Sequence, residues 1–127
     1  MGIGPYAGKT GEIFAAWKAS IIELATCGNV TVKIGGLGMR INGYDFHEPE
    51  VPPSSDRLAE AWKPYIDTCI EVFGTDRCMF ESNFPVDGIS CSYTVLWNSF
   101  KRITAGFTES EKANLFRDTA ERVYSIT

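Results

Sequence analysis

The chain has 127 residues, of which 44% are hydrophobic and 22% charged, and its net charge is −4. This is the composition of one globular domain, and it excludes an intrinsically disordered chain. Lysine and arginine form no run longer than Lys101-Arg102, which excludes a clustered basic surface for nucleic acid, and no apolar run approaches the ~20 residues of a membrane span.

The first predicted elements are a helix, a strand and a long loop. Apolar residues recur at spacings of three and four between Glu12 and Thr26, which predicts an amphipathic helix, and Gly28 stands where a left-handed C-terminal cap belongs. The β-branched run 30–34 predicts a short strand. Residues 39–53 contain prolines and an Asn-Gly pair and predict a long loop, a kind of segment that often carries function.

The second half of the chain repeats this order. Ser54 and Ser55 predict the start of a helix that Gly74 ends, and Pro64 inside it predicts a kink or a junction of two helices. Thr108 and Glu111 have the spacing of a capping box, which predicts the start of the last helix. The predicted elements are a helix at 54–73, a strand at 78–81, a helix at 92–105 and a helix at 109–123.

Strands that alternate with helices predict parallel strands and the α/β class. Two strands alone leave sheet edges unpaired and an apolar face uncovered. The sequence therefore predicts that residues 1–127 form a single incomplete domain. In parallel α/β proteins function gathers in the loops that follow the strands, which here are residues 35–53 and 82–91.

Polar residues surround the end of the second predicted strand. Glu81, Asn83 and Asp87 have a placement that aims ligands into a barrel mouth, although Asn83 and Asp87 are equally typical of turn residues. His47 is the one histidine, and a catalytic zinc usually takes at least three protein ligands, so His47 cannot build such a site by itself. Lys33 requires a carboxylate or ligand partner if it points inward, or solvent if it points outward.

Two segments resemble the amidohydrolase type 2 family. Residues 29–37 (NVTVKIGGL) resemble its seventh-strand segment, and residues 73–85 (FGTDRCMFESNFP) resemble its eighth strand and the loop after it. Residues 2–6 and 112–124 are similar to the stretch after the sixth strand and to the final helix. The resemblance implies a partial (β/α)8 TIM barrel, comprising about strands seven and eight with flanking helices, because a complete barrel has about 250 residues.

The resemblance also implies a divalent metal, zinc or manganese, in the full-length protein. The family holds it with histidines from the first, fifth and sixth strands and an aspartate from the eighth. Only the last position falls in this chain, and Asn83 occupies it. An amide oxygen is a weak metal ligand and no general base, so Asp87 or Glu81 is the expected catalytic substitute. We expect the isolated chain to bind no metal.

The implied activity is hydrolysis of a small lactone, ester or related carboxylated compound by a metal-polarised water, or decarboxylation of an acid. Arg40 and His47 are predicted to contact a substrate carboxylate, although Arg40 is equally explained as a solvated loop charge. Two alternatives stay open. One is a non-catalytic half-barrel that self-associates or pairs with the missing half; the other is a small hydrolase that uses Glu81 and Asp87.

The cysteines indicate a reducing compartment. They lie at positions 27, 69, 78 and 91 without any Cys-x-x-Cys pair, which argues against a zinc finger. Cys27, Cys69 and Cys78 lie in apolar segments, so we predict buried free thiols. Free thiols and the absence of a secretory pattern in the first residues predict a cytoplasmic protein.

Overall fold

The computed structural model describes residues 7–126. Two parallel strands and five α-helices follow one another in the order helix, strand, helix, strand, helices. The predicted α/β class is therefore confirmed, and the last predicted helix is divided by a π-helical stretch. The elements are α1 Thr10–Ala25, β1 Val32–Ile34, η2 Arg40–Asn42, α2 Ser55–Phe73, η3 Thr75–Arg77, β2 Cys78–Phe80, η4 Val86–Ile89, α3 Tyr93–Ile103, α4 Glu109–Ala113, η5 Asn114–Asp118 and α5 Thr119–Tyr124.

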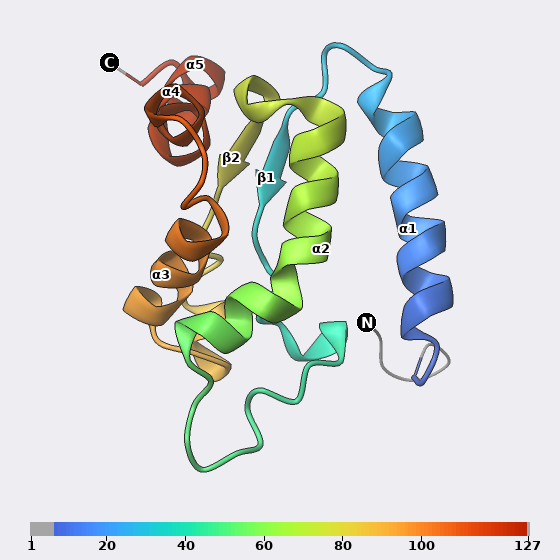
Figure 1. Ribbon diagram of the computed structural model, residues 1–127, viewed down its shortest axis with the longest axis vertical. Helices are drawn as coiled ribbons and strands as arrows, with labels where there is room; N and C mark the ends of the chain where they lie inside the picture. Colours follow the sequence, from blue (N-terminus) through green and yellow to red (C-terminus); the bar gives the residue numbers. More distant parts are fainter. Residues whose placement is uncertain (1–6, 127) are drawn as a thin grey trace.

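β1 and β2 pair in parallel, with Val32 opposite Cys78 and Ile34 opposite Phe80. One more hydrogen bond, 3.0 Å from the Glu81 amide to the Ile34 carbonyl, continues the pairing beyond β2. Both strands point toward the same end of the molecule, where the segments that follow them meet (Figure 1). Parallel pairing thus gathers the two loops at one edge of the sheet, as the sequence predicted.

The core fills the space between the sheet and the helices α2 and α3. Trp62 and Leu58 of α2 are fully buried, and Phe100 of α3 is 1% exposed. The ring of Phe80 stacks on Phe100 with centroids 4.4 Å apart. Burial of these large side chains is the main source of stability, because each contributes about 1.5–3 kcal/mol when it leaves water.

α2 is one continuous helix through Pro64, and it bends along its length (Figure 1). Proline lacks an amide hydrogen and its ring disfavours the straight helix, which accounts for the bend. The Ser54 side chain accepts a hydrogen bond from the Arg57 amide at 3.3 Å and caps the N-terminus. Gly74 ends the helix with φ 81°, a conformation that favours glycine.

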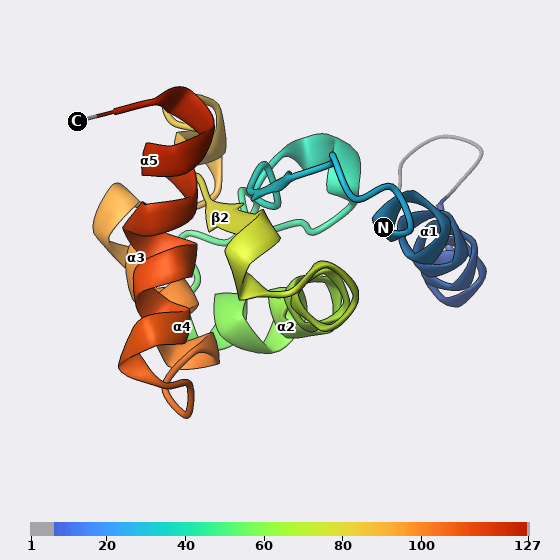
Figure 2. The ribbon, with the colours of Figure 1, turned by 90° about the horizontal axis from the view of Figure 1, so that it is seen from above.

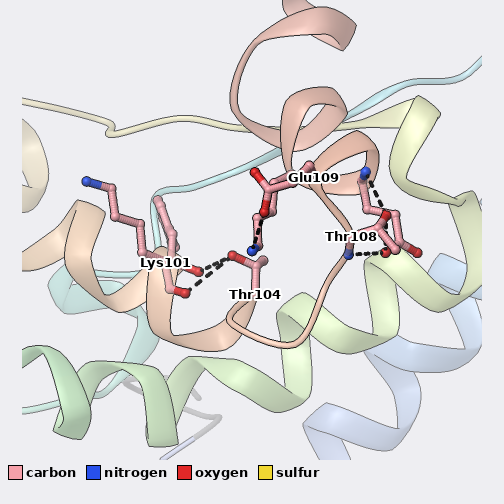
Figure 3. Close-up of polar contacts among 7 residues, drawn as sticks. Lys101, Thr104, Thr108 and Glu109 are labelled. Carbon is pink, nitrogen blue, oxygen red and sulfur yellow. Dashed lines mark hydrogen bonds and ion pairs between the residues drawn. The ribbon is translucent and has the colours of Figure 1, made fainter.

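The connection from α3 to α4 is fixed by side-chain caps (Figure 3). The Thr104 hydroxyl donates to the Phe100 carbonyl at 2.9 Å at the end of α3. At the start of α4 the Thr108 amide donates to Glu111 Oε2 at 2.8 Å, and the Glu111 amide donates to the Thr108 hydroxyl at 3.3 Å. The predicted capping box is therefore confirmed.

α1 lies at the side of the molecule, next to α2 (Figure 2). The amphipathic helix predicted here is present, but it has no buried residue. Phe14 and Trp17 contact the ring of Tyr65 with centroid distances of 4.9 and 5.0 Å. Arg77 donates to the carbonyls of Ala25 and Cys27, each at 3.1 Å, and so ties the end of α1 to η3.

The four cysteines are free thiols. Cys69, Cys78 and Cys91 are buried, but Cys27 is exposed, so the prediction of burial at Cys27 is wrong. Cys27 follows the end of α1, where too little of the chain covers it. No helix within residues 7–126 is long and apolar enough to cross a membrane.

Candidate functional site

The two loops that follow the strands are joined by buried hydrogen bonds. The Gly38 amide donates to Asp87 Oδ2 at 3.0 Å, and the Ser90 hydroxyl donates to the Gly38 carbonyl at 2.6 Å. These contacts bridge 49 and 52 residues of sequence. Both polar groups of the Gly38 backbone are thereby satisfied, and the loops form one unit.

Glycine is required at two positions where the first loop approaches the second. A Cβ atom at Gly38 would lie 3.0 Å from Asp87 Cγ, a tight contact that the Asp87 side chain would have to relieve by a small shift. At Gly35 a Cβ atom would overlap the Glu81 side chain and lie 2.7 Å from its carbonyl oxygen. The glycine-rich end of β1 thus lets the loop after β2 pack directly against the backbone.

Asn83 and Asp87 form a pair within the second loop. Asn83 Nδ2 donates to Asp87 Oδ1 at 2.7 Å, and the Asp87 amide donates to the Asn83 carbonyl at 3.1 Å. Asn83 has φ 51°, a left-handed conformation that asparagine tolerates better than most residues. The two residues therefore close a turn, and within residues 7–126 the Asn83 Oδ1 atom has no hydrogen-bond donor.

Asp87 is 1% exposed, and both of its carboxylate oxygens accept hydrogen bonds, from Asn83 and from the Gly38 amide. Burial raises the pKa of Asp87 above its usual range, and the two hydrogen bonds oppose that rise. A buried carboxylate with both oxygens engaged holds the loops together. Asp87 thus acts as the junction of the two loops.

Glu81 lies beside Lys33 on the strands. Lys33 Nζ lies 2.8 Å from Glu81 Oε2, so the strand lysine has a carboxylate partner while its side chain remains exposed. The hydrogen bond that Lys33 donates to Glu81 raises the pKa of Lys33. Both side chains are partly exposed, so water screens the pair and its effect on stability is small.

A cavity of about 500 Å³ opens between the two loops, and its residues come from both of them. His47 lines it, and His47 Nδ1 is buried without a hydrogen-bond partner. Arg40 lies on η2, is exposed and is not among the lining residues, so the structure does not bring the two predicted substrate residues together. The lining also includes aromatic residues that the sequence patterns did not single out: Phe46, Phe84 and Tyr93.

The residues of this chain do not by themselves fit a catalytic metal ion. Within residues 7–126 no three His, Cys, Asp or Glu side chains gather closely enough to hold one. Asp87 has both oxygens engaged, and Glu81 is paired with Lys33. Asn83 Oδ1 is the one candidate ligand atom at the predicted position, and one amide oxygen is too few for a catalytic zinc.

Comparisons with known proteins agree with the fold. The family model described as Amidohydrolase matches residues 1–126. The uncharacterized protein y4mH of Sinorhizobium fredii is 40% identical over 113 residues, which cover 89% of this chain and 34% of that protein. The L-fucono-1,5-lactonase of Burkholderia multivorans is 26% identical over 113 residues, which cover 88% of this chain and 36% of the lactonase.

Two crystal structures of an amidohydrolase from Burkholderia multivorans, one with bound HEPES and one with bound zinc, resemble this chain with TM-scores of 0.77 and 0.76. Each is 25% identical, and each match covers 90% of this chain and 38% of that protein. The chain thus spans 34% to 38% of the length of these relatives. With the family match over residues 1–126, these similarities confirm the predicted resemblance: the chain belongs to the amidohydrolase family.

Proposed function

We propose that this chain supplies strands seven and eight, with their flanking helices, to a metal-dependent (β/α)8 hydrolase that acts on a small lactone, ester or related carboxylated compound. The observation that carries the proposal is the locked pair of loops at the carboxyl ends of two parallel strands. Barrel enzymes bind substrates at this face. The similarity to a lactonase supports the substrate class.

In this proposal the chain provides substrate-binding loops and the rest of the barrel provides most of the metal site. The divalent metal, zinc or manganese, would supply a polarised water when bound. Asn83 Oδ1 is the proposed ligand from this chain. The isolated chain would be inactive, because the ligand cluster is missing within its described residues. Asp87, predicted as a catalytic residue, is proposed to hold the Asn83 amide in position.

His47 and Arg40 are the proposed substrate contacts. His47 lines the cavity between the loops, which supports a direct contact. Arg40 is exposed on η2, so a contact to it would be made by a substrate group that lies outside this cavity. The free thiols support placement in the reducing cytoplasm.

A chimera tests the proposed activity. The part of the Sinorhizobium fredii relative that precedes its match to this chain would be fused to the whole of this chain, since the two proteins are 40% identical in the matched region. We expect the chimera to bind zinc and to hydrolyse at least one compound from a panel of small lactones and esters, while the isolated chain hydrolyses none. A chimera that folds and binds zinc but remains inactive, beside an active parental relative, would contradict the proposal.

The role of Asn83 is tested by exchanging it with Asp87. In Asn83→Asp alone, two carboxylates would lie at hydrogen-bond distance and repel each other, so we expect a loss of stability. The double variant Asn83→Asp/Asp87→Asn restores every hydrogen bond, because the new side-chain amide at position 87 would donate to the new carboxylate at position 83 and accept from the Gly38 amide. We expect it to regain stability and, in the chimera, to bind zinc more tightly than the unaltered sequence. Unchanged zinc affinity would exclude residue 83 as a ligand.

The second candidate function is a non-catalytic half-barrel that self-associates. Apolar residues that remain exposed on α1 favour it: Ile22 is 46% exposed and Leu24 is 44% exposed. Sheets with unpaired edges and helices with uncovered apolar surface tend to associate. Sedimentation analysis of the isolated chain decides between the candidates: a stable dimer without hydrolysis in the chimera supports the half-barrel, and an active chimera supports the hydrolase.

A further inference from the structure

The cavity between the loops has predominantly apolar walls. Phe46, Pro49 and Pro52 line it from the first loop, and Phe84 and Ile89 line it from the second. Tyr93, at the start of α3, and Ile89 are 53% and 48% exposed, which opens the cavity to solvent. A volume of about 500 Å³ lies within the range of small-molecule sites. Aromatic and proline rings offer flat faces against which another ring packs.

One polar atom of the cavity lining lacks a partner. His47 Nδ1 is buried and has no hydrogen bond within the described residues. Two hydroxyls of the lining already take part in hydrogen bonds: the Ser90 hydroxyl donates to the Gly38 carbonyl, and the Ser92 hydroxyl accepts from the Val95 amide at 3.3 Å. A buried nitrogen without a partner is unfavourable, and a ligand with a hydroxyl or carbonyl group would satisfy it.

The electrostatic surroundings disfavour an anion. No Lys, Arg, Asp or Glu side chain lines the cavity in the part of the chain that is described. The Cys91 thiol, which lines the cavity, lies 4.0 Å from the backbone carbonyl of Asp87. Burial and, second, the Asp87 charge raise the pKa of the Cys91 thiol to about 11. A carboxylate in this cavity would lose its hydration without meeting a lysine or arginine side chain of the lining.

We propose that this cavity binds an uncharged ring of the substrate, and that His47 forms a hydrogen bond with a hydroxyl or carbonyl group on that ring. The inference rests on the proposed function and narrows its substrate class. The ring that enters the cavity is neutral, and any carboxylate of the compound stays outside it. A lactone ring meets these requirements, and its ring-opened hydroxy acid does not.

The first test uses the unaltered chain and two probes of equal ring size, benzyl alcohol and benzoate. Each is titrated into the ¹⁵N-labelled protein, and amide shifts are followed by NMR. We expect benzyl alcohol to shift the amides of His47, Gly88 and Ile89, and benzoate to bind at least about tenfold more weakly, a difference of about 1.4 kcal/mol. Equal binding of the two probes, or shifts confined to other parts of the chain, would overturn the proposal.

Two variants test the cavity, one by removing a hydrogen-bonding atom and the other by filling its volume. His47→Phe keeps a ring but removes Nδ1, and we expect the affinity for benzyl alcohol to fall about fivefold, which corresponds to one hydrogen bond. Gly88→Val fills the cavity, and its backbone tolerates a side chain because a Cβ atom would lie 3.4 Å from Phe84 Cε1, an ordinary contact. We expect binding to be lost in Gly88→Val. Ile41→Ala is the matched control, since Ile41 is 61% exposed and outside the lining.

Failure of this inference is distinguishable from failure of the proposed function. Binding is measured without catalysis, and hydrolysis is measured in the chimera. If probe binding depends on His47 and the chimera is inactive, the neutral-ring site is supported and the proposed hydrolase activity is contradicted. An active chimera whose activity is the same with His47→Phe and Gly88→Val, together with absent probe binding, would overturn the neutral-ring site alone.

Discussion

α1 and α2 are both amphipathic helices and lie side by side (Figure 2), but they differ in what their apolar faces contact. α2 has seven buried residues, which contact the sheet, α3 and, through Tyr65, α1, whereas α1 has none. α1 is attached by the ring contacts to Tyr65 and by the hydrogen bonds of Arg77. Apolar periodicity therefore predicts a helix and its apolar face, but it does not predict what covers that face.

This difference agrees with the proposal that the chain is part of a larger barrel. The stripe on α1 and the free edge of β1 border a second cavity, of about 400 Å³, lined by Trp17, Ile21 and Val32 among others. In a (β/α)8 barrel a helix packs on two neighbouring strands. Here Trp17 and Ile21 of α1 pack against the core but stay partly exposed, and Ile22 and Leu24 are 46% and 44% exposed.

The largest expected effect is the difference in stability between two variants that each replace one tryptophan, one in α2 and one in α1. Trp62 of α2 is fully buried, so Trp62→Ala should cost about 3–5 kcal/mol and leave little of the cooperative unfolding transition. Trp17→Ala in α1 should cost about 1 kcal/mol. Chemical denaturation followed by circular dichroism measures both. Similar losses for the two variants would show that α1 is as well packed as α2.

The next largest effect is expected on removing Arg77, which should destabilise α1 more than α2. Arg77→Ala deletes the donors to the Ala25 and Cys27 carbonyls and to the Phe73 carbonyl at the end of α2, which should cost about 1–2 kcal/mol. Hydrogen exchange should show α1 amides exchanging faster while the α2 amides that precede its last turn stay protected. Arg57→Ala is the matched control, because Arg57 pairs with Glu60 on the surface of α2. Faster exchange throughout α2 would contradict the separate attachment of α1.

The open face of α1 also governs association. If the isolated chain self-associates through this face, Ile22→Lys should weaken the assembly at least about tenfold, because an apolar side chain is replaced by a charge. Sedimentation velocity over a range of concentrations measures the change. Val51→Lys is the control, since Val51 is 78% exposed on the loop after β1. If only the loop variant weakens the assembly, the contact surface lies elsewhere.

The smallest effect is expected at the capping box, at the start of α4. Thr108→Ala should cost about 1 kcal/mol. Hydrogen bonds from Thr108 lower the pKa of Glu111 below 4.5 in the folded chain, so the stability linked to this group is present above pH 4.5 and is lost as the pH falls through the lowered pKa. Denaturation between pH 3 and 7 should show this loss in the unaltered chain and not in Thr108→Ala.

The sequence predicted the local elements well and the contacts between them poorly. The strands, the Pro64 helix and the capping box follow from short-range patterns. The contact between Gly38 and Asp87 spans 49 residues, and no sequence pattern in either loop predicts it. Cys27 was assigned to the core from its apolar neighbours, and it is exposed because α1 has no cover on that side.

For the candidate site, too, local patterns were predicted and contacts between segments were not. The alternation of strands and helices located the two loops, whereas the assignment of Asn83 to the metal position rests on the family resemblance and stays a prediction. The cavity required three-dimensional information, because Phe46, Phe84 and Tyr93 are ordinary aromatic residues until the loops bring them together around His47.

We propose that the metal site is shared between this chain and the rest of the barrel. The most direct test of this proposal is the zinc content of the isolated chain. The purified protein would be incubated with excess zinc, desalted and analysed by inductively coupled plasma mass spectrometry, beside the chimera that carries the rest of the barrel. We predict zinc far below one ion per isolated chain and close to one ion per chimera. One tightly held zinc on the isolated chain would contradict the account, because a complete metal site would then exist within these residues.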